Sequence, residues 1–185
     1  MLRRVLARRA LKAFAARYDY DVSYMEHMLR VSPAAFFGFA GLTRLARHRE
    51  AAPREAFYAA KLVGALAEDC GPCLQLVVRM AQEAGVADAQ IEAVLTRERD
   101  SMTADTRLGF RFADAVVKRA PEATAAREAV RRRWGEAGMI DLVLALQIGR
   151  IFPMVKAGLG FAETCQRVSL GARQVEVAGV AGEAA

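Results

Sequence analysis

The strongest constraint on the fold is a residue pattern that suits helices and nowhere sustains a strand. Alanine, leucine, arginine, glutamate and valine dominate the 185 residues, and the alternation typical of half-buried strands is not maintained anywhere. Propensity and spacing therefore both favour helix. A chain of this length buries roughly two thirds of its unfolded surface and needs neither metal nor disulfide to fold. We expect an all-α protein with a single compact domain.

Proline and capping residues mark where helices start. Pro33 and Pro53 each suit a first helical turn, where the missing amide costs no bond. Asp88 is expected to cap a short helix, and Thr103 or Thr106 to start another. The helices expected are residues 1–17, 22–29 after a connector at 18–21, a segment from 33, 56–67, a helix from the cysteine pair at 70–73 to 84, a short one after 88, one ended by Pro121, and then 123–135, 140–151 and 153–168.

These helices suggest three parts of the chain. Residues 1–50 are expected to form an N-terminal helical extension packed on the core, residues 51–168 the helical core, and residues 169–185 a mobile tail rich in glycine and alanine. The first helix is basic and amphipathic and superficially resembles an organelle transit peptide, but it lacks the apolar region and cleavage site of a secretory signal. A packing or oligomer-contact helix explains the same pattern, so we expect a cytoplasmic protein.

Positive charge comes from arginine and gathers in three clusters. The formal net charge is +6, with arginines at 3–9, 44–54 and 131–133. Such clusters attract phosphate or anionic lipid. Acids are scattered among them, however, and the aromatic residues of a nucleic-acid groove are not interleaved. Charges also interrupt every apolar stretch before the roughly 20 residues that cross a bilayer. We therefore expect solvated basic faces, with no nucleic acid and no membrane as partner.

Two of the three cysteines, Cys70 and Cys73, stand in the segment Glu-Asp-Cys-Gly-Pro-Cys at positions 68–73. Two intervening residues let the sulfurs meet when the segment turns into a helix, so a disulfide can form without a large backbone movement. Proline fits the first helical turn, where free amides lower the pKa of a facing thiol. In a reducing compartment, a close pair of this kind indicates redox chemistry or metal binding.

Other interpretations of these residues stay open. The pair is alternatively two small buried residues at a tight helix junction. Zinc would need two more ligands, and Cys165, His27 and His48 show no metal spacing. We interpret Cys165 as a core residue and both histidines as lone side chains. The sequence contains no glycine-rich phosphate loop and no His-Glu-x-x-His motif, so we expect no cofactor and no metal.

The order of elements around the pair resembles a known helical family. An apolar helix, then Cys-x-x-Cys opening a second helix, then Ala81-x-x-Ala84-Gly85 and a short helix with Ile91, is similar to the AhpD-like group of the carboxymuconolactone decarboxylase superfamily. The stretches 112–115 and 140–145 look like its second helical segment. The resemblance implies an AhpD-like helical bundle that assembles as a homo-oligomer, namely a trimer, hexamer or dimer. A thioredoxin fold is not expected, because its pair follows a β-strand.

The same resemblance implies a thiol-dependent peroxidase or disulfide reductase. Cys73 would attack the peroxide and Cys70 would resolve the sulfenic acid into a disulfide, with an unknown thiol as electron donor. The well-studied branch has a histidine four residues after the second cysteine and a glutamate twelve before the first. This chain has Val77 and Tyr58 there. The known proton relay is therefore missing, although only a thiolate is a competent nucleophile.

Two acids beside the pair are the local candidates to replace that relay. Glu68 and Asp69 would act as a base or proton path, would raise the thiol pKa by like-charge repulsion, or would simply solvate the helix junction. Arg79 or Lys61 would offset their charge if the fold brings either near.

We therefore predict a thiol-dependent redox protein with Cys73, Cys70, Glu68 and Asp69 as its catalytic residues. The alternative is a non-redox helical oligomer of the same superfamily. It would be an interaction module, or an acid/base enzyme of the decarboxylase type that uses Glu68 or Asp69. A basic nucleic-acid module is a third hypothesis.

Overall fold

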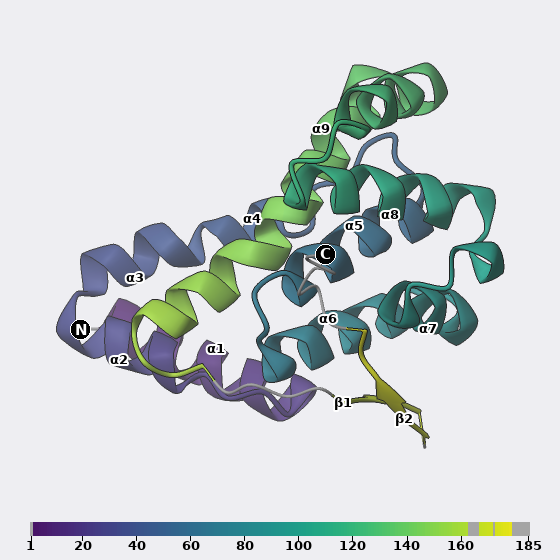
Figure 1. Cartoon of the computed structure of the whole chain (residues 1–185). Coiled ribbons are helices and arrows are strands. Elements are labelled where there is room, and N and C mark those ends of the chain that lie inside the picture. The colour runs from purple at the N-terminus through teal and green to yellow at the C-terminus, as the bar shows by residue number, and fades with distance from the viewer. Residues whose placement is uncertain (1, 163–166, 172, 179–185) are drawn as a thin grey trace.

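Helices account for most of the chain (Figure 1). The computed structural model describes residues 2–162, 167–171 and 173–178. The helices are α1 (Leu2–Tyr18), α2 (Ser23–Val31), α3 (Pro33–Ala40), α4 (Leu42–Leu45), α5 (Arg54–Leu66), α6 (Gly71–Glu83), α7 (Asp88–Thr96), a 3-10 turn (Arg99–Ser101), α8 (Ala104–Val117) and α9 (Ala123–Gly158). An antiparallel hairpin follows, formed by β1 (Arg167–Leu170) and β2 (Arg173–Glu176). The predicted helical class and single compact domain are confirmed, with the hairpin as an addition.

Helix α5 is central to the larger core. Nearly all of its residues from Ala56 to Leu66 are buried, and it packs against α8 and α9. Helices α8 and α9 approach α5 closely because they turn glycines toward it. A Cβ atom on Gly149 of α9 would lie 2.3 Å from the Lys61 carbonyl oxygen, and one on Gly109 of α8 would lie 2.4 Å from the Ala56 carbonyl oxygen. Small residues thus let three helices share one tightly packed core.

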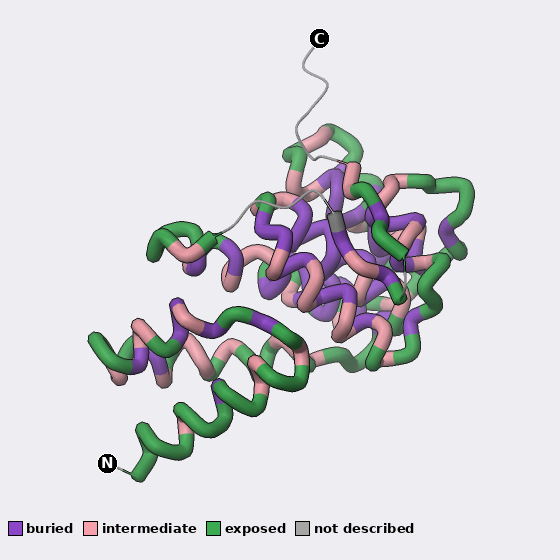
Figure 2. The backbone as a smooth tube through the Cα atoms, turned by 90° about the horizontal axis from the view of Figure 1, so that it is seen from below, coloured by how far each residue is buried: buried purple, intermediate pink, exposed green. Residues whose placement is uncertain are grey.

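A second, smaller apolar cluster joins the N-terminal helices to the start of α6. Its buried members include Tyr20, Tyr24 and Phe36 from the N-terminal segment together with Cys70 and Cys73. Figure 2 shows α1 as a largely exposed helix at the N-terminal end, connected to more deeply buried segments. Buried residues of the N-terminal helices therefore share an apolar cluster with the cysteine pair.

Helix α9 combines three segments that the sequence divides. Gly135 has non-helical backbone angles inside it (φ 69°, ψ −170°), so the helix boundary predicted there is confirmed. The start predicted at Pro153 is wrong, because the helix continues through that residue to Gly158. Proline removes only one donor. Ile148, Pro153 and Lys156 are all buried, so packing on both sides of the proline outweighs the lost bond.

The C-terminal region also differs from the sequence prediction. The last helix was expected to end near Val168 but ends at Gly158, and the strands β1 and β2 were not expected. Val168, Leu170 and Val175 are buried in the larger core, so the hairpin forms because its apolar side chains find a surface to cover. Cys165, interpreted as a core residue, lies outside the described residues.

Among the described helices, α9 is the one whose length and composition would allow it to cross a membrane. The expectation that charges interrupt every apolar stretch is therefore too strict for this helix. Half of its most apolar stretch is buried inside the protein, and Asp141 and Arg150 within the helix are both bound to other parts of the chain. The same composition is found in the core helix of a globular domain.

Candidate functional site

The two cysteines form a disulfide at the start of α6. Cys70 is the extended residue before the helix, and Cys73 lies in the first turn, with the two Cα atoms 5.3 Å apart. Gly71 and Pro72 fill the positions between them, where the proline costs little because first-turn amides have no helical partner. Both cysteines are buried, with 2% and 3% of their surfaces exposed. The predicted pairing at a helix start is confirmed.

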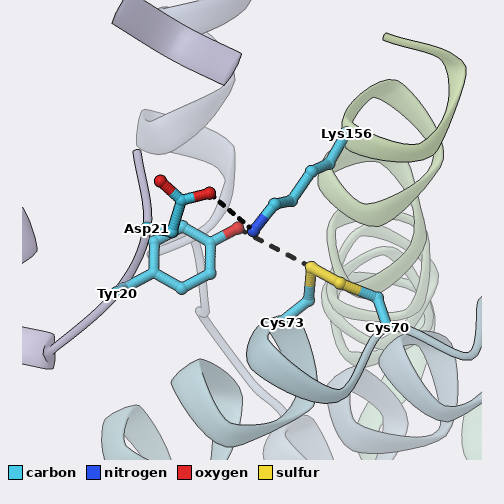
Figure 3. Close-up of a disulfide and its surroundings, with 5 residues drawn as sticks. All are labelled: Tyr20, Asp21, Cys70, Cys73 and Lys156. Atoms are coloured by element: carbon cyan, nitrogen blue, oxygen red, sulfur yellow. Dashed lines mark hydrogen bonds and ion pairs between the residues drawn. A yellow bond between two sulfur atoms is a disulfide. The ribbon is translucent and has the colours of Figure 1, made fainter. Parts of the chain in front are cut away.

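The hydroxyl group of Tyr20 contacts the second cysteine. Tyr20 lies in the connector between α1 and α2, and its oxygen is 3.6 Å from the Cys73 sulfur (Figure 3). Burial raises the pKa of Tyr20 to about 12, against a smaller opposing effect of the Tyr24 hydroxyl. The phenol therefore keeps its proton at neutral pH and is available as a hydrogen-bond donor to sulfur.

A buried lysine lies beside that tyrosine. The Lys156 side chain is 1% exposed, and its ammonium is 3.2 Å from a carboxylate oxygen of Asp21. The same ammonium lies 5.0 Å from the centre of the Tyr20 ring and 5.9 Å from that of the Tyr24 ring. Figure 3 shows lysine, tyrosine and disulfide converging from α9, the α1–α2 connector and α6. We refer to Tyr20, Asp21 and Lys156 as the lysine cluster.

Asp21 links the lysine cluster to solvent. Its side chain is 52% exposed and accepts hydrogen bonds from the amide and the hydroxyl of Ser23, at 2.9 and 2.8 Å. Burial acts to raise the pKa of Asp21, but the hydrogen bonds from Ser23 and Lys156 together hold the pKa below its usual value. Asp21 is therefore charged at neutral pH and serves as the counter-ion that a buried ammonium requires.

Sequence reasoning missed the lysine cluster. The sequence predicts a connector at residues 18–21 and places Lys156 in the last helix without a role. One weak signal was present, because Lys156 directly follows the apolar residues 151–155, apart from the chain's charged faces. Nothing in the sequence indicated that this position and the connector meet at the cysteines.

Glu68 and Asp69 lie in the turn before the disulfide, where the sequence places them. The Glu68 carboxylate forms an ion pair with Arg150 of α9, at 2.6 Å. Asp69 is exposed and adopts the left-handed backbone region, with φ of 45°. Glu68 thus ties the α5–α6 turn to α9, and Asp69 shapes that turn. Their action as a base on the thiol stays a prediction.

Arg79 of α6 holds the connector that carries Tyr20. Its guanidinium donates to the carbonyl oxygens of Tyr18 and Asp19 and pairs with the Asp19 carboxylate at 3.2 Å. Arg79 therefore positions the connector that carries Tyr20. Its charge is paired with Asp19 and not with Glu68 or Asp69.

Lys61 is a second buried lysine, 2% exposed, with partners of its own. Its ammonium donates to the Ala46 carbonyl oxygen at 2.6 Å and lies 4.6 Å from the centre of the Phe57 ring. Burial lowers the pKa of Lys61 to about 8. These contacts place its charge at the end of α4, where it anchors the chain between α4 and α5.

Stability is expected to depend on Lys61 between about pH 8 and pH 10.5. The unfolded chain holds this proton up to about pH 10.5, whereas the folded protein releases it above about pH 8. Folding is therefore penalised below pH 8, and the penalty disappears as the pH rises through this range. In urea titrations, the free energy of unfolding should rise relative to that of Lys61→Met across the range. A difference that stays constant with pH would contradict this assignment.

The well-studied AhpD-like branch has its relay histidine and glutamate at the positions that Val77 and Tyr58 occupy in this chain. Val77 is buried on α6, one turn after Cys73. Tyr58 packs against Phe57 with ring centres 5.5 Å apart, and burial raises its pKa. Valine has no proton to exchange, and a protonated phenol is not a base, so neither residue restores that relay.

The contacts of the two histidines are with residues other than the cysteines. His48 is 3.7 Å from the buried carboxylate of Asp141. His27 contacts Arg30 at 3.1 Å and the ring of Phe161. Across the part of the chain that the structure describes, no group of three or more histidine, cysteine or acidic residues is arranged to hold a metal ion.

Fold and site together define a class: a mostly helical single-domain protein with a Cys-x-x-Cys pair at disulfide distance. Comparison with protein-family models, with curated proteins and with solved structures gives no match for this chain. The class is therefore carried by the fold and by the geometry of the disulfide alone.

Proposed function

We propose that the protein is a thiol redox protein of AhpD-like type, whose Cys70–Cys73 pair cycles between dithiol and disulfide. The observation that carries the proposal is the disulfide itself, formed at a helix N-terminus with a phenol hydroxyl 3.6 Å from the second sulfur. Cysteine pairs in this position combine a short path to a disulfide with a lowered thiol pKa. The sequence resemblance to the AhpD-like group supports the same activity.

The substrate is a hydroperoxide or a partner disulfide. The Cys73 thiolate attacks the terminal peroxide oxygen, the O–O bond breaks, and the remaining fragment takes a proton and leaves as an alcohol. Cys70 then attacks the sulfur of the Cys73 sulfenic acid, and water leaves as the disulfide forms. Two electrons pass from the thiols to the peroxide. A thiol donor returns the pair to the dithiol and is itself oxidised.

Peroxide treatment of the reduced protein tests this proposal. In a Cys165→Ser background, we expect each equivalent of hydroperoxide consumed to remove two thiols and to produce the Cys70–Cys73 disulfide. Cys73→Ser should abolish peroxide consumption. Cys70→Ser should instead stop after one turnover, with the sulfenic acid at Cys73 available for trapping, because the resolving thiol is gone. Thiol titration and intact mass measure both outcomes.

Equal peroxide consumption in the parent and in both cysteine variants would overturn the peroxidase reaction. If a small dithiol or glutathione also failed to reduce the disulfide, the redox function as a whole would fall. The alternative of a non-redox oligomer or of acid/base chemistry at Glu68 or Asp69 would then take its place.

A further inference from the structure

A reactive cysteine needs a group that stabilises its thiolate, because an ordinary thiol with a pKa near 8.5 is mostly protonated at neutral pH. The N-terminus of α6 provides part of this stabilisation. Glu68 provides none, because a carboxylate repels a thiolate, and its pairing with Arg150 at 2.6 Å only reduces that repulsion. Figure 3 shows the Lys156 ammonium beside Asp21 and the Tyr20 ring, whose hydroxyl contacts the Cys73 sulfur.

We propose that Lys156 is a positioning residue that acts through Tyr20 to hold reduced Cys73 as a thiolate, with Asp21 as the counter-ion of the lysine. This inference rests on the redox function proposed above and adds the group that makes Cys73 reactive. The Lys156 ammonium is fully buried and lies over the Tyr20 ring, and the hydroxyl of that ring contacts the Cys73 sulfur. This juxtaposition is the observation that supports the proposal.

Burial makes this arrangement effective. An ammonium that is 1% exposed acts on nearby charge through a medium of lower dielectric than water, so its effect on a thiolate is larger than that of a surface lysine. The cation lies over the Tyr20 ring, which favours a fixed position for both groups. The hydroxyl of that ring donates to the sulfur when the sulfur is an anion, and charge-assisted bonds of this kind are the stronger ones.

The charged and titratable groups around the lysine cluster agree with this role. Asp21 faces Lys156 from the α1–α2 connector, and Tyr20 and Tyr24 face it as protonated phenols. Near the cysteines, Glu68 is paired with Arg150. In the disulfide state, Asp21 is therefore the one anion beside Lys156 among the residues that the structure describes. Reduction adds the Cys73 thiolate as a second anion. The lysine charge then favours the dithiol form and makes the disulfide more oxidising.

The rate of Cys73 alkylation as a function of pH tests the inference directly. The parent for this experiment carries Cys70→Ser and Cys165→Ser, so that iodoacetamide reports on Cys73 alone. Lys156→Met keeps the length of the side chain and removes its charge. We expect it to raise the midpoint of the alkylation profile by about one pH unit, so that the rate at pH values below both midpoints falls roughly tenfold. Tyr20→Phe, which removes only the hydroxyl, should shift the midpoint in the same direction.

Two variants separate the charge from a general packing effect. Lys156→Arg keeps a cation and should restore most of the parent profile. Lys61→Met removes the other buried lysine, which bonds the Ala46 carbonyl oxygen, and should leave the midpoint unchanged. With both cysteines present and at a pH above both midpoints, Lys156→Met should also shift the glutathione equilibrium roughly tenfold toward the disulfide, or about 30 mV.

An unchanged midpoint in Lys156→Met, or equal shifts in Lys156→Met and Lys61→Met, would overturn the inference. If Lys156→Met does not fold, an unchanged midpoint in Tyr20→Phe overturns it as well. These results are independent of the redox function itself. A protein that forms and reduces its disulfide normally but ignores Lys156 contradicts only this inference, whereas a protein that never forms the disulfide contradicts the proposed function.

Discussion

Replacing Asp141 with alanine is expected to lower the free energy of unfolding by about 3 kcal/mol. Asp141 lies within α9 and is completely buried. Its carboxylate accepts the backbone amide of Glu50 at 2.9 Å, that of Ala51 at 2.8 Å and that of Ala52 at 2.9 Å. Alanine would leave these amides without their acceptor, and the buried amide of Ala52 cannot turn to water. The loop before α5 would then lose its attachment to α9.

Urea denaturation of matched variants measures this effect. Asp141→Asn keeps an accepting oxygen and should cost less than alanine. Asp105→Ala removes a partly exposed acid that pairs with Arg133 and should cost under about 1 kcal/mol. A loss at Asp141 no larger than that at Asp105 would show that the amides find other partners.

Gly149→Ala is expected to destabilise the protein by about 1–3 kcal/mol, the usual cost of forcing extra atoms into a packed core. The added Cβ atom would lie 2.3 Å from the Lys61 carbonyl oxygen and 3.1 Å from Gly64 Cα. Both are backbone atoms of α5, so they cannot rotate away and the two helices must separate. Gly149→Val should cost more, because its side chain is larger.

Gly158→Ala is the matched control at the end of the same helix. A Cβ atom there meets nothing within 4 Å, so this variant should be neutral or stabilising by up to about 1 kcal/mol, since alanine favours helix over glycine. Thermal or urea unfolding of the two variants separates the steric effect from helix propensity. Equal stabilities would mean that α5 and α9 tolerate a wider spacing.

Both predictions concern α9, which also positions the candidate site. Arg150, next to Gly149, pairs with Glu68 in the turn before the disulfide, and Lys156 lies less than two turns further along. A wider spacing of α5 and α9 would therefore move both cations relative to Cys70 and Cys73. For this reason the Gly149→Ala variant is to be assayed for disulfide exchange as well as for stability.

Most helix positions could be predicted from the sequence because the start and stop signals act locally. Thr103 accepts a hydrogen bond from the Thr106 amide at 3.2 Å and is the cap of α8, one of the two candidates. Gly85, two residues beyond the end of α6, has φ of 79°. Asp88 was wrong as a cap, since it is the first residue of α7 and accepts a bond from Gln82 at 2.9 Å instead.

The errors occur where packing overrides a local signal. Pro153 indicated a helix start, yet the buried residues around it keep α9 continuous. The hairpin was missed because its strands are short and their apolar residues, such as Val168 and Val175, become informative only when a core surface is present to cover.

The sequence by itself determined the helical class and the cysteine pair, because helix propensity and a two-residue spacing between thiols are properties of neighbouring residues. The tertiary structure alone decided what surrounds that pair. Tyr20 and Asp21 come from the N-terminal connector and Lys156 from the end of α9. A buried cation acts on a sulfur only at short range, so the groups that control Cys73 are set by which distant segments pack together.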